Sequence, residues 1–307
     1  MRYRPLGDSG LMVSVVGLGC NNFGGRLDLD RTRAVVEAAL DAGVTLLDTA
    51  DIYGGQGGSE ELLGRVLEGR RDEVVLATKF GMDMHGKNGP DFGARGSRRY
   101  IRRAVEASLR RLRTDHIDLY QYHEPDGVTP IAETLAALHE LVVEGKVRYI
   151  GGSNMAAWQV VDAEWTARQA GSTRLISAQN EYSLLRRDAE RELLPACAEF
   201  GIGVLPFFPL ASGLLTGKVG RDRPPAAGTR LEGREVAVAD LDRIERLTVY
   251  AQERGRSLLD VAIGGLAAQP AVGSVIAGAT SAEQVRANVA AGEWEPTADD
   301  LAALAAL

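Results

Sequence analysis

Four polar residues, Asp48, Tyr53, Lys79 and His123, stand at or just after the ends of three short apolar segments. A phenol with a pKa of about 10 is a poor acid at neutral pH. A neighbouring ammonium group favours the phenolate and lowers that pKa. A carboxylate would keep the ammonium group charged, and a histidine could polarise or orient a carbonyl oxygen. Together these four residues would make a general acid that protonates an alkoxide as it forms.

Each of the four residues also has an ordinary structural explanation. Asp48 could cap a helix or join a salt bridge, and Lys79 could extend its charged end to the rim of a sheet. Tyr53 could be a packed ring in a glycine-rich turn, and His123 could be structural. The chemical interpretation therefore depends on whether the fold brings all four side chains into one pocket.

The chain alternates short apolar, β-branched segments with longer segments of helical period. This alternation is typical of βα units around a parallel sheet. Eight strands are predicted, at residues 15–19, 45–48, 74–79, 117–122, 149–153, 176–180, 203–207 and 274–277. The matching helices are predicted near 30–42, 59–68, 97–112, 129–144, 156–170, 188–200, 257–268 and 281–290.

Eight βα units favour a closed barrel over an open doubly wound sheet, and no G-x-G-x-x-G motif follows the first strand. We therefore expect an α/β chain that forms a single (β/α)8 TIM barrel domain over residues 1–307. It should carry a short N-terminal hairpin (2–5 with 12–14) and extra C-terminal helices, at 239–254 and from Thr297. Residues 219–235, rich in Gly, Pro and Arg, should form a mobile loop at the active face, with a tolerated surface insertion as the alternative.

Composition excludes several classes of protein. The 307 residues are 45% hydrophobic and 25% charged, with a net charge of -7, which favours a soluble globular protein over a disordered chain or one that binds nucleic acid. No apolar segment is long enough to span a membrane, and no secretory signal begins the chain, so we expect a cytoplasmic protein. Cys20 and Cys197 form no spaced cluster, so neither a disulfide framework nor a bound metal is expected.

Seven arginines between residues 98 and 113 could be mistaken for a nucleic-acid patch. Most of them fall on one side of a predicted helix whose other side carries Ile101, Val105, Leu109 and Leu112. We interpret them as the solvated face of a barrel helix.

The sequence resembles the aldo-keto reductases over nearly its whole length. The matching segments occur in the family's order and spacing, and they are LLDTADIYGGQGGSEELLGRVL, VVLATKFG, LRRLRTDHIDLYQYHEPD, VRYIGGSN, QNEYSLL, PFFPLASGLLTGK and VIAGATSAEQVRANVAA. The resemblance implies NAD(P)H-dependent reduction of an aldehyde or ketone. It implies that Tyr53 donates the proton, that Lys79 paired with Asp48 tunes Tyr53, and that His123 positions the carbonyl.

The same resemblance implies the cofactor contacts. Ser153, Asn154 and Gln179 should bind the nicotinamide carboxamide, and Phe207 should stack on the nicotinamide ring, unless the match is displaced by one residue to Phe208. The pyrophosphate should be wrapped by the segment 209–218, through Leu210, Ser212, Gly213, Leu214 and Lys218. The adenosine end should meet residues after the eighth strand, namely Gly278, Thr280, Gln284 and Asn288.

The resemblance predicts the choice between NADPH and NADH less directly than it predicts the cofactor contacts. Many NADPH-using relatives carry Arg or Lys in the segment 278–288, where this chain has only Arg286, which lies off the Ser281–Gln284–Asn288 face. NADPH is expected on family prevalence, with NADH as the alternative.

Substrate and assembly are left open by the sequence. Asn22, Phe23, Phe80, Glu124 and Tyr182 are candidate pocket residues, and the short C-terminus leads us to expect an open site for small aldehydes, ketoses or keto-sugars. Glu124 should favour polyols over anionic substrates. The family also includes potassium-channel β subunits, so a cofactor-binding regulatory subunit with little turnover is the alternative function. The oligomeric state is not predicted.

Overall fold

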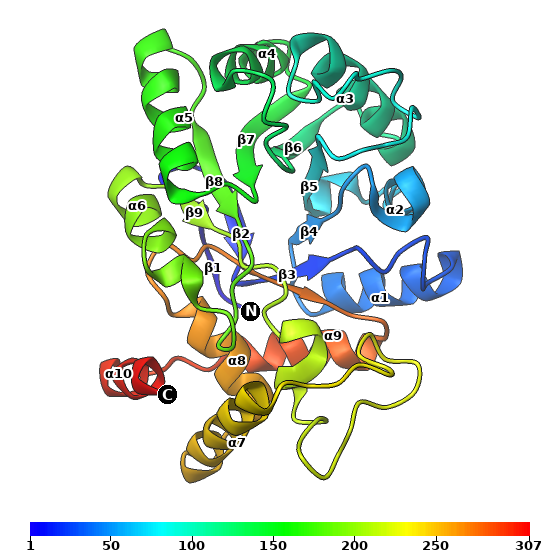
Figure 1. The fold of residues 1–307 in the computed structure, drawn as a ribbon. Coiled ribbons are helices and arrows are strands. Elements are labelled where there is room, and N and C mark those ends of the chain that lie inside the picture. Colours follow the sequence, from blue (N-terminus) through cyan, green and yellow to red (C-terminus); the bar gives the residue numbers. More distant parts are fainter.

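The computed structural model describes residues 1–307 and shows a parallel sheet of eight strands surrounded by helices (Figure 1). The strands are hydrogen-bonded in the order β10-β3-β4-β5-β6-β7-β8-β9, so each βα unit lies beside the next. Their bounds are β3 (Val16–Gly19), β4 (Leu46–Asp48), β5 (Val75–Phe80), β6 (Ile117–Tyr122), β7 (Val147–Ser153), β8 (Leu175–Gln179), β9 (Gly203–Val204) and β10 (Val275–Gly278).

Backbone hydrogen bonds close the sheet between its first and last strands. Val204 N donates to Ala271 O at 2.6 Å, and Gly273 N donates to Val204 O at 2.9 Å. Further along, Ile276 N donates to Pro206 O at 3.0 Å. The strands therefore form the predicted (β/α)8 barrel. β9 is shorter than the predicted 203–207, because only its first residues pair regularly with β8.

The helices follow the strands in alternation and cover the outside of the barrel (Figure 1). They are α1 (Leu29–Asp41), α2 (Tyr53–Val66), α3 (Arg98–Leu112), α4 (Ile131–Val143), α5 (Ala157–Ala170), α6 (Leu193–Phe200), α8 (Leu258–Ala267) and α9 (Ala282–Ala291). The two additional helices that were predicted are α7 (Val238–Glu253) and α10 (Ala298–Ala306). None of these helices is long and apolar enough to cross a membrane.

Two predicted helices differ from the structure at their N-terminal ends. α2 begins at Tyr53 rather than at residue 59, but its residues Gly54–Gly57 have positive φ angles and form a left-handed turn before the regular helix. The predicted helix 188–200 is divided into a short 3-10 turn over Asp188–Glu190 and α6. Both differences arise where the backbone turns sharply before a regular helix begins.

A short antiparallel hairpin, β1 (Tyr3–Pro5) with β2 (Met12–Ser14), closes the barrel at the N-terminal ends of its strands. Leu6 is fully buried in a small apolar cluster that includes Leu46, Ala77, Leu119 and Leu205 from the barrel interior. The turn packs so closely that a Cβ on Gly7 would lie 2.5 Å from Gly201 O. The positive φ of Gly7 adds a second reason for glycine at this position.

The larger core lies between the sheet and the helices and contains 69 buried residues. Alternation along the strands separates the two cores: Leu46 and Leu119 face the barrel interior, whereas Leu47 and Tyr120 face the helices.

The arginine-rich helix α3 presents most of its arginines to solvent or to ion pairs with α4 and the residues that follow it, as Arg98 does with Glu140 and Arg102 with Glu144. Arg111 is the exception, because it pairs with the fully buried Glu60 of α2 at 2.6 Å. The predicted solvated face is therefore correct for most of these residues, and Arg111 serves internal packing.

Candidate active site

The C-terminal ends of neighbouring strands bring the four predicted catalytic side chains together. Asp48 ends β4, Lys79 lies near the end of β5, and His123 directly follows β6. Tyr53 follows β4 by five residues and starts α2. Lys79 Nζ lies 2.7 Å from Asp48 Oδ2 and 3.5 Å from the hydroxyl of Tyr53. The ring centroids of Tyr53 and His123 are 5.8 Å apart, with the rings nearly perpendicular.

The ion pair between Asp48 and Lys79 is buried. The Lys79 side chain is 0% exposed and that of Asp48 is 4% exposed. Lys79 Nζ also donates to Thr49 O at 2.9 Å. Because burial strengthens an attraction between opposite charges and makes an unpaired charge costly, this pair fixes the position of the ammonium group beside Tyr53.

Two glutamine amides complete the surroundings of the Asp48 carboxylate. Gln179 Nε2 donates to Asp48 Oδ1 at 2.8 Å, and Gln121 Nε2 donates to the same oxygen at 3.2 Å. Gln121 was not predicted from the sequence. Its alternation with the outward-facing Tyr120 and Tyr122 on β6 is the signal that could have placed it inside the barrel.

Burial and charge set the protonation of these groups. Burial, the largest influence, lowers the pKa of Lys79, but Asp48 and Tyr53 together raise this pKa above its usual value. Burial, followed by the positive charge of Lys79, lowers the pKa of His123 to about 3, so the imidazole is neutral. Its Nδ1 atom is buried and has no hydrogen-bond partner in the protein.

The pKa of Tyr53 differs from the sequence-based expectation. Burial of the phenol raises its pKa, and this outweighs the lowering caused by Lys79, while Asp48 raises it further. The expectation of a lowered pKa was wrong because the sequence indicated the charged neighbour but not the loss of hydration. Tyr53 is therefore a protonated phenol that lies beside a cation.

The residues predicted to bind the carboxamide lie together at the ends of β7 and β8. Asn154 Nδ2 donates to His123 O at 3.0 Å and to Ser153 Oγ at 3.2 Å. Asn154 N donates to Gln179 O at 3.0 Å. Gln179 is joined to Asp48 through its amide nitrogen, and its Oε1 accepts no hydrogen bond from the protein.

The segment after β9 presents two aromatic rings and an irregular backbone. The ring centroids of Phe207 and Phe208 are 5.2 Å apart, and Phe208 is 39% exposed. Residues Ala211–Thr216 form a 3-10 segment (η3), in which Ser212 and Gly213 have positive φ angles. Leu210, Ser212 and Gly213 are partly buried, Leu214 is buried, and Lys218 is exposed.

The segment after β10 carries the residues predicted for the adenosine end. Ser281 caps α9 by accepting from Gln284 N, while Gln284 Oε1 accepts from Thr280 N at 2.8 Å. Gly278 and Gln284 are exposed, and Asn288 is buried. Arg286 is exposed and forms no ion pair, which agrees with its expected position away from the capping face.

Arg230 is a candidate that the sequence analysis missed. It belongs to the segment 219–235, which has no regular helix or strand and crosses to the loop after β3. Arg230 Nη2 donates to Asn22 Oδ1 at 3.2 Å and to Asn21 Oδ1 at 3.3 Å. Its guanidinium lies 5.5 Å from the ring centre of Phe208, and it has no carboxylate partner. Because these hydrogen bonds join residues 208 and 209 positions apart, no local pattern indicated them.

Three predicted pocket residues are placed elsewhere. Phe80 is fully buried and stacks against Tyr120 and Tyr122, on the helix-facing side of the sheet. Tyr182 is fully buried, with its hydroxyl on Glu190 at 2.7 Å, and Phe23 is also fully buried. Asn22 lies at the site, where its Oδ1 accepts a hydrogen bond from Arg230. Glu124 is exposed next to His123.

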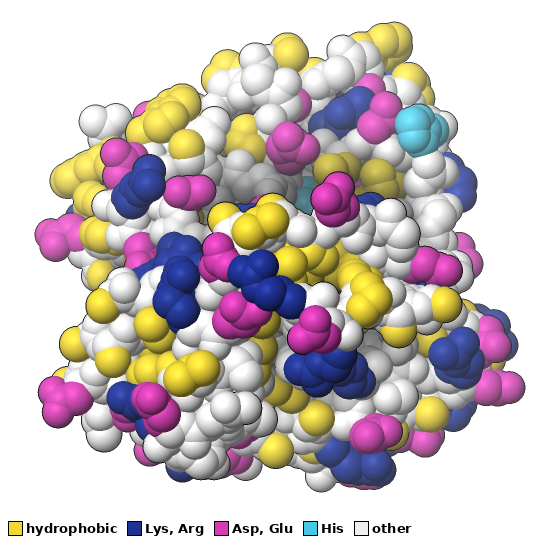
Figure 2. Space-filling view, turned by 60° about the horizontal axis from the view of Figure 1, so that its bottom comes forward, with side chains coloured by type: hydrophobic (Ala, Val, Ile, Leu, Met, Phe, Trp, Pro, Cys, Tyr) yellow, Lys and Arg dark blue, Asp and Glu magenta, His cyan; other side chains and the backbone are white.

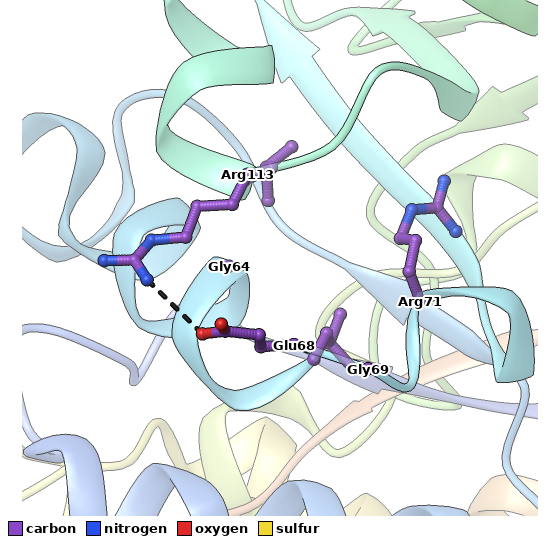
Figure 3. A pocket seen from close by; sticks show the side chains of 7 residues that line it. Gly64, Glu68, Gly69, Arg71 and Arg113 are labelled. Atoms are coloured by element: carbon purple, nitrogen blue, oxygen red, sulfur yellow. Dashed lines mark hydrogen bonds and ion pairs between the residues drawn. The ribbon is translucent and has the colours of Figure 1, made fainter.

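Two hollows can be seen in the protein. The space-filling view shows a hollow on one face, with hydrophobic side chains within it and side chains of both charges around it (Figure 2). A cavity lies between the ends of α2 and α3, where Arg113 and Glu68 form an ion pair and Arg71 points away from them (Figure 3). Since these helices end near the starts of β5 and β6, that cavity lies at the opposite end of the barrel from Lys79.

The barrel places the Tyr53 phenol and the neutral His123 imidazole beside the buried Asp48–Lys79 ion pair. The sequence model of the Aldo/keto reductase family matches residues 15–307, and the chain belongs to this family.

Named relatives align with almost the whole chain. An uncharacterized oxidoreductase of Bacillus subtilis, YrpG, is 40% identical, covering 95% of this chain and 91% of that protein. A probable voltage-gated potassium channel subunit beta of Oryza sativa is 36% identical, with 95% and 91% covered. L-glyceraldehyde 3-phosphate reductase of Escherichia coli K12 is also 36% identical, with 95% and 87% covered.

Proposed function

We propose that this protein reduces an aldehyde or ketone to the alcohol with NAD(P)H, and that Tyr53 is the general acid. The contact of the partly buried Tyr53 hydroxyl with Lys79 Nζ, itself paired with Asp48 in a buried ion pair, carries the proposal. A protonated phenol can donate a proton, and the adjacent ammonium group stabilises the phenolate that remains. The proton that leaves Tyr53 passes to the substrate oxygen as negative charge develops there.

His123 is proposed to orient the carbonyl group. Its low pKa keeps the imidazole neutral, so one ring nitrogen can donate a hydrogen bond without carrying a positive charge. The Tyr53 and His123 rings lie close together, with centroids 5.8 Å apart, and we propose that both side chains meet the same substrate oxygen. This neutral donor complements the acid instead of competing with it for the proton.

The residues present fit a nicotinamide cofactor. Gln179 Oε1, which accepts no hydrogen bond from the protein, can accept one from a carboxamide, and Ser153 and Asn154 lie beside it. An aromatic ring, Phe207, is available for stacking. When bound, the reduced nicotinamide supplies a hydride to the carbonyl carbon.

Phosphate groups of the cofactor are proposed to lie along residues 210–218 and under Arg230. Ser212 and Gly213 have positive φ angles, and a turn built from small residues in this conformation lets an anion approach the backbone closely. Arg230, which has no carboxylate partner, adds a positive charge beside Phe208. We propose NADPH as the preferred cofactor because it prevails in the family. NADH is the alternative, because no cation other than Arg286 stands in the segment 278–288 to meet a 2′-phosphate.

The substrate is proposed to be a small aldehyde, a sugar or a keto-sugar. An E. coli relative is named as a reductase of glyceraldehyde 3-phosphate, which supports a short carbonyl compound. We further propose that residues 1–307 act as one domain, in the cytoplasm, with small molecules as its partners and without nucleic acid or a membrane.

A cofactor-absorbance assay with a reactive aromatic aldehyde tests this function, with NADPH and NADH compared in parallel. We expect wild-type turnover and its loss in Tyr53→Phe, while cofactor affinity is retained. Turnover that survived in Tyr53→Phe would contradict the assignment of the acid. The ratio of kcat/KM for the two cofactors decides between NADPH and NADH.

The second candidate is a cofactor-binding regulatory subunit. The similarity to proteins named as probable potassium channel β subunits in Oryza sativa and Arabidopsis thaliana, at 36% and 35% identity, favours it. This candidate predicts tight cofactor binding with very slow oxidation by every carbonyl offered. Single-turnover measurement of the bound cofactor separates it from the reductase.

A further inference from the structure

The loop between β5 and α3 holds the segment that carries Tyr53 at two points. Lys87 Nζ donates to Gly55 O at 2.9 Å and to Gln56 O at 3.3 Å. Asn88 Nδ2 donates to Asp51 Oδ2 at 3.0 Å. The first contact follows Tyr53 in sequence and the second precedes it, so two adjacent residues of one loop hold both sides of the proposed acid.

The held segment has a strained backbone. Four consecutive residues, Gly54 to Gly57, have φ angles of 68°, 76°, 68° and 116°. Gln56 is the one among them with a side chain, and the left-handed conformation costs such a residue about 1–2 kcal/mol. A strained turn persists only when its surroundings hold it. Lys87 provides such a contact, because its ammonium group binds two carbonyl oxygens of the turn.

Asp51 is anchored from inside the protein. It is fully buried, Oδ1 has no partner, and Asn88 donates the only side-chain hydrogen bond to Oδ2. Burial, followed by the nearby Glu60, raises the pKa of Asp51 well above its usual value. Asparagine has almost the same shape as aspartate and keeps an oxygen that can accept from Asn88, which makes Asp51→Asn a mild change and Asp51→Ala a severe one.

Asn88 is itself fixed by its neighbours. It is 5% exposed, and its Oδ1 accepts from Arg111 Nη1 at 3.4 Å. Arg111 in turn pairs with the buried Glu60, whose other oxygen accepts from Thr78 Oγ1 at 2.6 Å. Side chains from β5, α2 and α3 therefore fix the position of Asn88, and the exposed part of its own loop does not.

From these contacts we propose that Lys87 and Asn88 are positioning residues for catalysis, which hold the left-handed turn and Asp51 so that the Tyr53 phenol stays beside Lys79 and His123. This inference rests on the proposed function of Tyr53. Neither residue touches the reacting atoms; both act through the backbone of residues 51–56.

Kinetics of Lys87→Met and Asn88→Ala test the inference, with Arg99→Met as the control, since Arg99 is an exposed cation on α3 without an ion pair. We expect kcat to fall about 10-fold in each variant, because a small misplacement of a catalytic group costs up to about 10²-fold. The Kd for NADPH should stay unchanged, and Arg99→Met should match wild type. Lys87→Arg and Asp51→Asn should restore most of the activity that Lys87→Met and Asp51→Ala lose.

Two readouts distinguish positioning from general stability. The apparent pKa in the pH profile of kcat should move in Lys87→Met and Asn88→Ala, because Tyr53 then lies differently against the groups that face it, which are Lys79, Asp48, Cys20, His123 and Arg230. Amide hydrogen exchange over residues 53–57 should accelerate in both variants without a change at α4 or α5. Lys87 is exposed, so Lys87→Met should fold even if Asn88→Ala does not, and the Lys87 variant alone can then decide the test.

The inference is overturned where both variants keep kcat within about 2-fold of wild type, or where exchange accelerates and the pH profile does not move. If the wild-type protein reduced no carbonyl compound, the proposed function would be refuted, but the proposal that Lys87 and Asn88 hold the turn would not. Hydrogen exchange would then still decide whether Lys87 and Asn88 hold the turn: unchanged exchange in Lys87→Met would overturn that part as well.

Discussion

Replacing Lys79 with methionine would separate the structural and chemical contributions of the buried ion pair. The change removes the ammonium group 2.7 Å from Asp48 Oδ2 and leaves a carboxylate that is 4% exposed with only the two glutamine amides as side-chain donors. Removing one member of a buried pair costs about 3–5 kcal/mol, because the other charge is left uncompensated. We therefore expect the free energy of unfolding to fall by about that amount.

The double variant Asp48→Asn, Lys79→Met provides the matched control. The amide carbonyl that replaces the Asp48 carboxylate can still accept from Gln179 and Gln121, and no buried charge remains. We expect the double variant to be more stable than Lys79→Met alone by about 2 kcal/mol, since residues in contact are not additive. Both variants should lack reductase activity, because neither has a cation beside Tyr53.

Urea unfolding followed by tryptophan fluorescence measures these free energies, and the cofactor-absorbance assay measures activity. A double variant as unstable as the sum of its two single variants would show that the two side chains are not coupled, and would refute the reasoning. Activity retained in Lys79→Met would instead refute the role of the ammonium group while leaving the ion-pair energetics intact.

Three further predictions concern other parts of the molecule. The pKa of His123 is about 3 in the folded protein and 6.5 in the reference state, so folding stability should be lost as the pH falls from about 6.5 toward 3; pH-dependent urea unfolding of His123→Gln should lack that component. Leu6→Ala should destabilise the protein by about 2–5 kcal/mol by calorimetry or urea unfolding, whereas exposed Met12→Ala should not. Arg230→Met should raise the Kd for NADPH by about 10- to 150-fold in a fluorescence titration, which corresponds to about 1.5–3 kcal/mol for a charged hydrogen bond, and an unchanged Kd would place the phosphates elsewhere.

The parts of the fold that depend on local patterns were predictable. Strand ends could be read from apolar segments that stop at Asp48, Lys79 and His123, and eight such segments imply a barrel whose neighbouring strands share one face. Helical periodicity after the seventh and eighth strands also anticipated α7 and α10. Local periodicity fixes an element and its direction, and in a barrel this already fixes which end of the strand faces the site.

Features that depend on burial or on distant contacts were not predictable. The raised pKa of Tyr53 follows from desolvation that only the packed structure reveals, and Phe80 faces the helices because of its register within β5. Arg230 meets Asn21 and Asn22 in the loop after β3, more than 200 residues earlier in the chain, and Gln179 donates to Asp48 from a strand four positions away in the sheet. Such contacts leave no periodic signature in the sequence.

The N-terminal hairpin has a consequence for synthesis on the ribosome. Leu6 and Gly7 are made well before Gly203 and Gly273, against which they pack. The late segment also supplies Ala271 and Gly273, whose backbone groups join β9 and so close the barrel. Contacts of such sequence separation form slowly. The base of the barrel is therefore sealed only after Gly273 has left the ribosome, and until then Leu6 lacks the partners that bury it, which leaves an apolar side chain available for aggregation.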